Sequence, residues 1–390
     1  MSEMQSFLVP DYYPAFSCKM GACRHPCCEG WPVSISMKDY FSLLSVECSP
    51  ELRRRLDAGL HLALHPQPEA YAQITPRYDG QCPLHLSDGR CALQAELGET
   101  ALAAVCRLYP RGVRRGNGML ECSCAASCEA VPEMLLHRQE PLSFVALSLS
   151  LTPPALPPRQ HTFYTADHEG DLRRWFIALM QNRRYPLPQR LIRLGQAMRA
   201  ADEAIAQEDD QQLAQLLENQ HTLPPLPESI DSPAPIACGL KAARQLLELL
   251  DRRSNSIRTY GEAVLALIGT DEGAAQRYQA AQANFAWLIP QWETWFEHLL
   301  VNHMFFAQFP FQDRPVPLKD EFLALCAVYV LMRLLAVGWM WEHTGEDAAT
   351  DVMAAVFRLV EHTEFDCLAA PLLQELTGGD SSQLLPLLNL

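Results

Sequence analysis

Cysteines dominate the first third of this sequence. Eleven of the fourteen precede residue 129, and ten of those fall into three groups. The groups lie in FSCKMGACRHPCCEGW, in CPLHLSDGRC continuing to CRLYPRG, and in ECSCAASC. Crowded thiols indicate either a disulfide framework or thiolate ligation of a metal. The candidate ligands are Cys18, Cys23, Cys27, Cys28, Cys82, Cys91, Cys106, Cys122, Cys124 and Cys128.

The redox state of the cellular compartment decides between disulfides and metal ligation. The first ten residues, MSEMQSFLVP, have no basic stretch, apolar run or small-residue cleavage site of a secretory signal. We therefore expect a cytoplasmic protein whose thiols stay reduced, and metal ligation rather than disulfides.

The spacing of the thiols leaves two kinds of metal site open. Structural zinc prefers paired cysteine knuckles, whereas iron–sulfur clusters accept four thiolates at varied spacing. In the first group, Gly21 and Pro26 allow the loop to fold back so that its four thiols converge. His25 and His85 lie among the cysteines, and we interpret them as bystanders because ten thiols are available. Spacing alone does not choose between zinc and iron, and it leaves room for two sites.

A radical S-adenosylmethionine site is disfavoured by the same spacing. That motif requires Cys-x3-Cys-x2-Cys, with one iron left open. Here Cys23 and Cys27 have the first spacing, but Cys28 follows at once.

The elements that must position these thiols are short. Before residue 150, helical periodicity covers residues 39–44, 50–64, 98–108 and 128–138, with Ser49 as a cap before the second of these. Residues 114–121, around Gly116-Asn117-Gly118, are typical of a hairpin, and no run alternates long enough to predict a larger sheet.

Beyond Pro153, Pro154, Pro157 and Pro158 the pattern is helical. We place the domain boundary there, between residues 1–150 and 151–390, with a proline-rich link at 223–236 that divides the second domain. The prediction is a mainly α fold: an irregular cysteine-rich metal-binding N-terminal domain followed by an all-helical C-terminal domain. The expected helices after the boundary span residues 171–181, 189–206, 209–219, 237–250, 256–269, 272–306 with a break at Pro290, 318–343, 347–362, 369–377 and 381–388.

One apolar segment, residues 322–341, is long enough to cross a membrane. Because Arg333 lies near its middle, we predict a buried core helix and no membrane association.

Charge limits the partners. The chain carries 31 basic and 46 acidic residues, a formal net charge of −15. Nucleic-acid binding needs a basic face, so this partner is excluded, whereas a partner that presents lysines is compatible. Residues 1–150 have net charge −3 and residues 151–390 have −12, so we expect such a partner to dock on the second domain.

Together the motifs resemble a known family. The runs CKMGACRHPCC, CPLHLSDGRC and VCRLYP resemble the zinc- or iron-chelating cysteine-cluster superfamily. The segments YYPAFSC, EGWPVSIS and NHMFFAQFPF resemble one branch of it, the flagellin lysine N-methylases. This resemblance implies a cytoplasmic enzyme that uses S-adenosyl-L-methionine to methylate lysines of flagellin, with a [4Fe–4S] cluster held by these cysteines. The gap from Cys18 to Cys23 is wider than the superfamily's usual spacing, so the ligands within the first group stay open.

Methyl transfer to lysine needs a neutral amine and a pocket for a sulfonium donor, which aromatic faces and carboxylates hold. The sequence has no glycine-rich strand-to-helix turn of the familiar kind. Arg107, Tyr109 and Arg111 directly follow Cys106 and are one candidate group for binding the cofactor, although they are equally typical of a hydrogen-bonded metal loop.

A second candidate group lies near Pro290. Trp292, Trp295 and Asn302 are candidates for cofactor binding, and core packing is the more common role of such residues. The weak catalytic candidates are Tyr109, Glu293 and His303. The alternative function is a non-catalytic protein that chelates zinc or iron.

Overall fold

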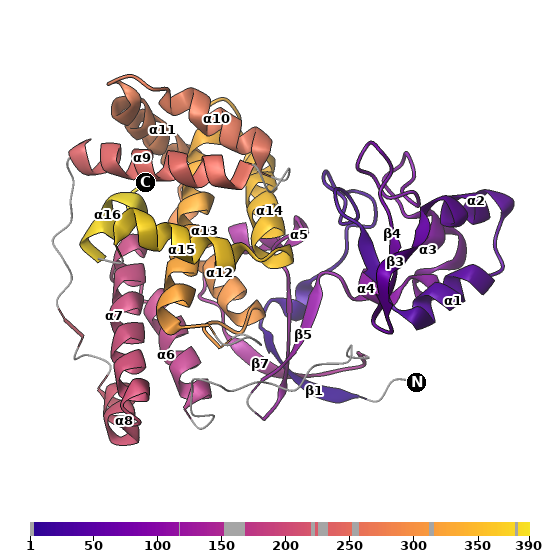
Figure 1. Ribbon diagram of the computed structural model, residues 1–390, viewed down its shortest axis with the longest axis horizontal. Coiled ribbons are helices and arrows are strands. Elements are labelled where there is room, and N and C mark those ends of the chain that lie inside the picture. The colour runs from indigo at the N-terminus through magenta and orange to yellow at the C-terminus, as the bar shows by residue number, and fades with distance from the viewer. Residues whose placement is uncertain are drawn as a thin grey trace.

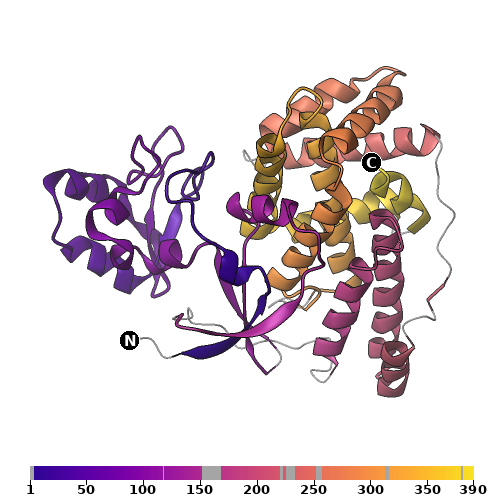
Figure 2. The ribbon, with the colours of Figure 1, turned by 180° about the vertical axis from the view of Figure 1, so that it is seen from behind.

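Two bodies of unequal size make up the molecule. The structure, a computed structural model, describes residues 4–116, 118–151, 168–219, 223–224, 233–251, 257–311, 316–378 and 381–390. We call residues 17–108 the cysteine lobe, and the remaining described residues the main body. In Figure 1 the cysteine lobe (indigo to purple) projects to one side of the helices of the main body, and Figure 2 shows the same separation from behind.

The cysteine lobe contains a small sheet covered by short helices. Its strands are β2 (Val33–Ile35), β4 (Ala70–Ile74) and β3 (Leu60–Gln67), joined antiparallel in that order. Its α-helices are α1 (Met37–Ser45), α2 (Pro50–Gly59), α3 (Ala92–Leu97) and α4 (Ala104–Leu108). The Ser49 side chain accepts a hydrogen bond from the backbone of Leu52, which confirms the predicted cap of α2. Eleven residues, from Ile35 to Ala103 in the sequence, form a separate hydrophobic core.

A four-stranded sheet joins this lobe to the helices. It contains β1 (Gln5–Pro10), β5 (Arg111–Arg115), β6 (Leu120–Cys124) and β7 (Phe144–Leu149), in the order β5-β6-β1-β7. Strand β1 runs parallel to β6 and antiparallel to β7. The predicted hairpin is confirmed as β5 and β6, in which Arg115 pairs with Leu120. Phe7 and Val9 of β1 point into the core of the helical region, so the sheet is part of the main body.

Helices form the rest of the main body and agree closely with the predicted ones. Helix α13 lies at the centre and contacts α7, α10, α11, α14 and α15. The helices are α5 (Ala130–Leu136), α6 (Glu169–Met180), α7 (Leu187–Ala206), α8 (Asp210–Glu218), α9 (Pro233–Asp251), α10 (Arg258–Ile268), α11 (Ala274–Leu288), α12 (Trp292–Phe306), α13 (Leu318–Trp339), α14 (Glu346–His362), α15 (Phe365–Thr377) and α16 (Ser381–Leu388).

Helix α13 is the one described helix that passes a length-and-hydropathy test for a membrane span. Its most apolar window has a mean hydropathy of 2.1 and is 89% buried inside the protein. Arg333 has polar partners within the core, since its Nε donates to the Leu390 carbonyl at 3.1 Å and its guanidinium lies 3.8 Å from the Trp292 ring centre. The prediction of a buried core helix is confirmed.

Three features of the sequence prediction are wrong. The helix expected at residues 50–64 ends at Gly59, and its remainder becomes strand β3, because a short apolar run suits either state and pairing with β4 decides. The helix expected at 98–108 divides into a 3-10 turn (Glu99–Ala101) and α4. Of the main sheet only the β5–β6 hairpin was predicted, because β1 and β7 are far apart in sequence and join it through long-range pairing.

The domain boundary stays a prediction. Residues 152–167, which include the four prolines, lie outside the described residues, as do 225–232 of the proline-rich link. The hydrophobic cores divide the described chain elsewhere. Residues 7–16 and 113–142 pack with the later helices, whereas residues 35–103 form the core of the cysteine lobe.

Candidate functional site

A large hollow lies where the cysteine lobe meets the main body. This cleft has a volume of about 1540 Å³. The lobe contributes residues 34–39 and 99–105, and the main body contributes β5 and the end of β7 together with Phe306 and His362. A space of this size is large enough for a cofactor and a substrate side chain together.

Arg107, Tyr109 and Arg111, predicted from their position after Cys106, all line the cleft. The guanidinium of Arg111 lies 5.2 Å from the ring centre of Phe16, and Nη1 of Arg107 donates to the Thr100 carbonyl at 3.3 Å. Burial raises the pKa of the Tyr109 hydroxyl, so this group stays protonated at neutral pH. The cleft therefore offers two cations and an uncharged phenol along one wall.

Five of the predicted thiols affect one another electrostatically in the cysteine lobe. The pKa of Cys27 is raised, first by a hydrogen bond with Cys28 and then by burial. For Cys28 the hydrogen bond with Cys27 lowers the pKa, but a hydrogen bond with Cys82 and burial outweigh it and raise the value to about 12. Burial, with the nearby Cys27 and Cys91, raises the pKa of Cys106 to about 12. These thiols come from four separate segments of the chain, and folding brings them into one neighbourhood.

Three further thiols, those of Cys18, Cys23 and Cys128, form a second neighbourhood with Cys27. Burial, followed by Glu129 and then Cys18 and Cys27, raises the pKa of Cys23 to about 11. Burial is also the main reason that the pKa of Cys128 is raised to about 12, with Cys27, Cys23 and Cys18 adding to it. Cys27 thus lies within electrostatic range of thiols in both neighbourhoods.

Cys122 and Cys124 occupy a different environment, on strand β6 in the core of the main body. They are 1% and 0% exposed, and the Cys122 thiol donates to the Tyr13 hydroxyl at 3.5 Å. Burial raises the pKa of both thiols. These two cysteines lie outside the cysteine lobe, and of the other predicted ligands Cys128 is near enough to Cys124 to add to the increase in its pKa.

The cysteines in these two neighbourhoods are the type of ligand that a thiophilic metal requires, because metals that prefer thiolates need several cysteines within reach of one another. Among the residues that the structure describes, however, no three histidine, cysteine or acidic side chains stand in ready metal-binding geometry. His25 lies 3.6 Å from Asp351, and His85 hydrogen-bonds Gln81 at 3.4 Å.

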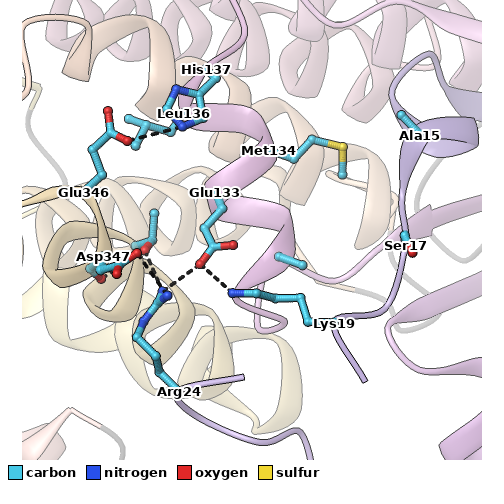
Figure 3. Close-up of a pocket in the computed structure, with 12 residues that line it drawn as sticks. Ala15, Ser17, Lys19, Arg24, Glu133, Met134, Leu136, His137, Glu346 and Asp347 are labelled. Carbon is cyan, nitrogen blue, oxygen red and sulfur yellow. Dashed lines mark hydrogen bonds and ion pairs between the residues drawn. The ribbon is translucent and has the colours of Figure 1, made fainter. Parts of the chain in front are cut away.

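A charged clamp fixes the first cysteine group to the main body. Lys19 Nζ lies 2.7 Å from Glu129 and 2.9 Å from Glu133. Arg24 pairs with Glu133 at 2.7 Å and with Asp347 at 3.0 Å, as Figure 3 shows. Four of these residues border a second, smaller pocket of about 540 Å³, namely Lys19, Arg24, Glu133 and Asp347.

Glu129 is the centre of this clamp. Its side chain is 1% exposed, and it also accepts hydrogen bonds from the backbone N–H groups of Arg24 and His25 at 3.1 and 3.0 Å. Because Glu129 directly follows Cys128, the clamp holds Cys128 against the loop that carries Cys18, Cys23 and Cys27.

With this geometry in place, the comparison with known proteins decides the family. The family described as "FliB lysine N-methylase C-terminal domain" matches residues 173–373, which is more than half of the chain. The chain belongs to this family. The predicted resemblance to the flagellin lysine N-methylases is thereby confirmed. The segment NHMFFAQFPF at residues 302–311 lies inside the matched region, whereas the cysteine motifs precede it.

Two relatives align with most of this member of the family. Proteins named lysine-N-methylase from Salmonella typhimurium and Salmonella choleraesuis are each 23% identical over 356 residues, which covers 85% of this chain and 86% of theirs. A protein named flagellar biosynthetic protein FliU from Salmonella muenchen is 26% identical over 130 residues, 33% of this chain and 75% of its own. No solved structure matches the chain. These names support a methyltransferase.

The second group of predicted residues lies on α12 of the main body, and none of them lines the cleft. Trp295 is fully buried, and its Nε1 donates to the Pro132 carbonyl at 2.9 Å. Trp292 packs against Arg333 as described above, and Glu293 accepts a hydrogen bond from the backbone of Leu187 at the start of α7 at 3.0 Å. The structure therefore does not bring these residues together with Arg107, Tyr109 and Arg111.

Asn302 and His303 are also buried, at 0% and 8% exposure. Asn302 accepts a hydrogen bond from the Tyr12 hydroxyl and donates to the Cys124 carbonyl at 2.9 Å, so it fixes β6 to α12. Nδ1 of His303 lies 3.7 Å from Glu361 in the interior. These contacts hold the main body together beneath the cleft.

Sequence reasoning missed the polar group that does reach the cleft. His362 lines the cleft at the end of α14, and its Nε2 lies 2.8 Å from Ser127 Oγ. Ser127 Oγ in turn lies 3.1 Å from the Tyr109 hydroxyl. No local motif marks His362, since its partners are more than 230 residues away in the sequence. The one signal in the sequence was the predicted cleft residue Tyr109, to which His362 is linked through Ser127.

Proposed function

We propose that this protein transfers methyl groups from S-adenosyl-L-methionine to lysine side chains of flagellin, and that an iron–sulfur cluster bound by its cysteines supports the site. The observation that carries this proposal is the large cleft beside the cysteine lobe, in a chain related to lysine N-methylases over most of its length. The flagellar name of the FliU relative supports flagellin as the substrate.

The cleft residues suit the cofactor chemically. S-adenosyl-L-methionine supplies an activated methyl group on a sulfonium, and it carries a carboxylate. Arg107 and Arg111 would bind that carboxylate, because guanidinium groups bind carboxylates through paired hydrogen bonds. The aromatic faces of Tyr109 and Phe16 border the same space and favour a cation.

The iron–sulfur proposal rests on the two thiol neighbourhoods. Cys27, Cys28, Cys82, Cys91 and Cys106 share one, and Cys18, Cys23 and Cys128 share the other with Cys27. A bound cluster would supply a rigid anchor for Arg107 and the adjoining cleft wall. A neutral lysine nitrogen is already a nucleophile, so an electron-donating role is not needed for the reaction.

The substrate lysine has to reach the cleft from a large partner. The acidic excess of residues 151–390, with net charge −12, favours a surface rich in lysine. We expect this docking to weaken as salt rises, because surface charges are screened over about 10 Å at 0.1 M salt.

The test is a methylation assay with protein purified without oxygen. Purified flagellin is incubated with S-adenosyl-L-methionine and the protein, and peptides are analysed by mass spectrometry. The proposal predicts one-methyl mass increments on flagellin lysines, and a brown protein with iron and sulfide. A metal-loaded preparation that leaves flagellin unmodified would overturn the proposed activity, and a colourless zinc-loaded preparation that methylates would overturn only the iron–sulfur part.

The non-catalytic alternative makes a different prediction. A metal-chelating binding protein would take up metal and show no affinity for S-adenosyl-L-methionine. Titration calorimetry of the metal-loaded protein with this cofactor separates the two functions, because only the methylase releases or absorbs binding heat.

A further inference from the structure

A hydrogen-bonded chain of three side chains ends at the wall of the cleft. It runs from the Tyr109 hydroxyl through Ser127 Oγ to His362 Nε2, with distances of 3.1 and 2.8 Å. Ser127 is fully buried, whereas His362 is exposed and lines the cleft with Tyr109. The imidazole is therefore the open end of this chain.

The surroundings of His362 fix its orientation. The carboxylate of the preceding residue, Glu361, accepts hydrogen bonds from the backbone N–H groups of Ala126 and Ser127 at 3.3 and 3.1 Å. The ring of Trp31 lies 5.2 Å from the imidazole at an angle of 33°. The other ring nitrogen, Nδ1, has no hydrogen-bond partner among the residues that the structure describes, and it is the atom free to meet a ligand.

The reaction needs a proton acceptor, and such an imidazole can be one. A lysine side chain has a pKa near 10.4, so at neutral pH its nitrogen carries a proton and has no free electron pair. A proton acceptor is most effective when it titrates near the working pH, as imidazole does. Asp39, Glu69 and Glu99 also line the cleft, but carboxylates normally titrate well below neutral pH.

The groups that face His362 support an uncharged resting state. Although His362 is exposed on the side of the cleft, partial burial of its ring is the main influence and lowers its pKa. The Glu361 carboxylate opposes this effect, and the Arg358 guanidinium adds to it. Ser127 and Tyr109 contribute hydroxyl groups, and burial keeps Tyr109 protonated. The imidazole is then neutral before the substrate arrives.

We infer that His362 accepts the proton from the ammonium group of the substrate lysine, an inference that rests on the proposed function. An N–H bond of the lysine breaks, and a new N–H bond forms on the imidazole, which becomes a cation. The freed electron pair on the lysine nitrogen then forms the bond to the methyl carbon of the sulfonium donor, and the sulfur leaves with the electron pair of its broken bond. The imidazole later releases its proton to solvent through the cleft.

The experiment compares His362→Gln with the unaltered protein and with His65→Gln, a control at an exposed histidine of strand β3 in the cysteine lobe. Loss of a proton acceptor lowers kcat by roughly 100-fold to 10,000-fold. We expect a loss in that range for His362→Gln, with flagellin binding and KM within about twofold of the unaltered protein. His65→Gln should leave kcat unchanged.

Two further readouts separate proton transfer from a structural role. In the unaltered protein kcat should rise as pH passes upward through the pKa of His362 and then level off, and this limb should disappear in His362→Gln. Added imidazole should restore part of the activity of His362→Ala. Near-ultraviolet circular dichroism and metal content check that each variant is folded.

The outcomes distinguish this inference from the proposed function. An unaltered protein that does not methylate flagellin overturns both. If it does methylate, a His362→Gln variant with kcat within twofold overturns the inference alone. So does a slow variant that keeps the pH limb and whose His362→Ala counterpart is not rescued by imidazole.

Discussion

The cysteine lobe and the main body are stabilised in different ways. The main body has one continuous core, in which α13 is buried on nearly all sides, whereas the core of the cysteine lobe consists of eleven buried residues. A core that small rarely provides much stability by itself, and small folds usually depend on disulfides or metal. From this difference we propose that metal held by the thiols stabilises the lobe, while the main body provides one wall of the cleft.

The largest expected effect comes from removing the metal that we propose the thiols bind. Structural metal can contribute on the order of 10 kcal/mol to folding of a small domain. Chelation or oxidation should therefore unfold the cysteine lobe and leave the main body intact. Hydrogen–deuterium exchange should show lost protection in residues 33–106 and retained protection in α12 and α13. Equal loss in both regions would show that the two are not independent.

Next in size is a cavity in the core of the main body. Replacing a fully buried tryptophan by alanine costs about 3–5 kcal/mol, so Trp295→Ala should lower the free energy of unfolding by that amount. Its metal content should stay unchanged, because Trp295 lies in α12, away from the cysteine lobe. Trp287→Ala is the control, since this side chain is 77% exposed. Loss of metal in Trp295→Ala would contradict the separation of the two regions.

The charged clamp joins the two regions, and breaking it should have an intermediate effect. Glu129→Ala removes the partner of Lys19 and of two backbone N–H groups, which should cost about 2–4 kcal/mol in docking of the loop. We expect weaker metal retention and faster exchange of residues 18–28. Asp347→Ala is the matched control, because Asp347 is 75% exposed and a surface ion pair contributes about 1 kcal/mol or less. Identical metal retention in Glu129→Ala and the unaltered protein would exclude the clamp as a support for the thiols.

Substitutions in the cleft wall should have a smaller effect, confined to the affinity for the cofactor. Arg107→Ala and Arg111→Ala should each weaken binding of S-adenosyl-L-methionine by roughly tenfold, a loss of about 1.4 kcal/mol. Calorimetry measures this directly. Arg193→Ala serves as control, since Arg193 lies in α7 and contacts Tyr185. Unchanged affinity in both cleft variants would place the cofactor elsewhere.

The smallest effect is a pH dependence that belongs to the main body alone. Burial lowers the pKa of His298, whose Nδ1 lies 3.2 Å from the Leu135 carbonyl. The unfolded chain therefore binds a proton more readily than the folded one. Stability should be full above the unfolded value of about 6.5 and fall as pH drops below it. Denaturant titrations of the unaltered protein and His298→Gln should converge at low pH. If the difference in stability between the two proteins does not change with pH, His298 is excluded as the cause of the pH dependence.

The helices of the main body could be predicted because their apolar residues repeat at helical spacing, as in 347–362, which matches α14 within one residue. The sheet could not, because β1 pairs with β6 and β7 across more than a hundred residues. The same limit applies to the site. Arg107, Tyr109 and Arg111 were found because they adjoin a marked cysteine, whereas His362 reaches the cleft only through the packing of α14 against the segment after β6.

The most direct test of the central claim is to locate the bound cofactor. Ultraviolet crosslinking of radiolabelled S-adenosyl-L-methionine to the metal-loaded protein, followed by peptide mapping, reports which residues it touches. If the cofactor binds in the cleft, the label will be on the peptide that contains Tyr109 and Arg111. Label on the peptide of residues 285–306, with Trp292 and Trp295, would contradict it.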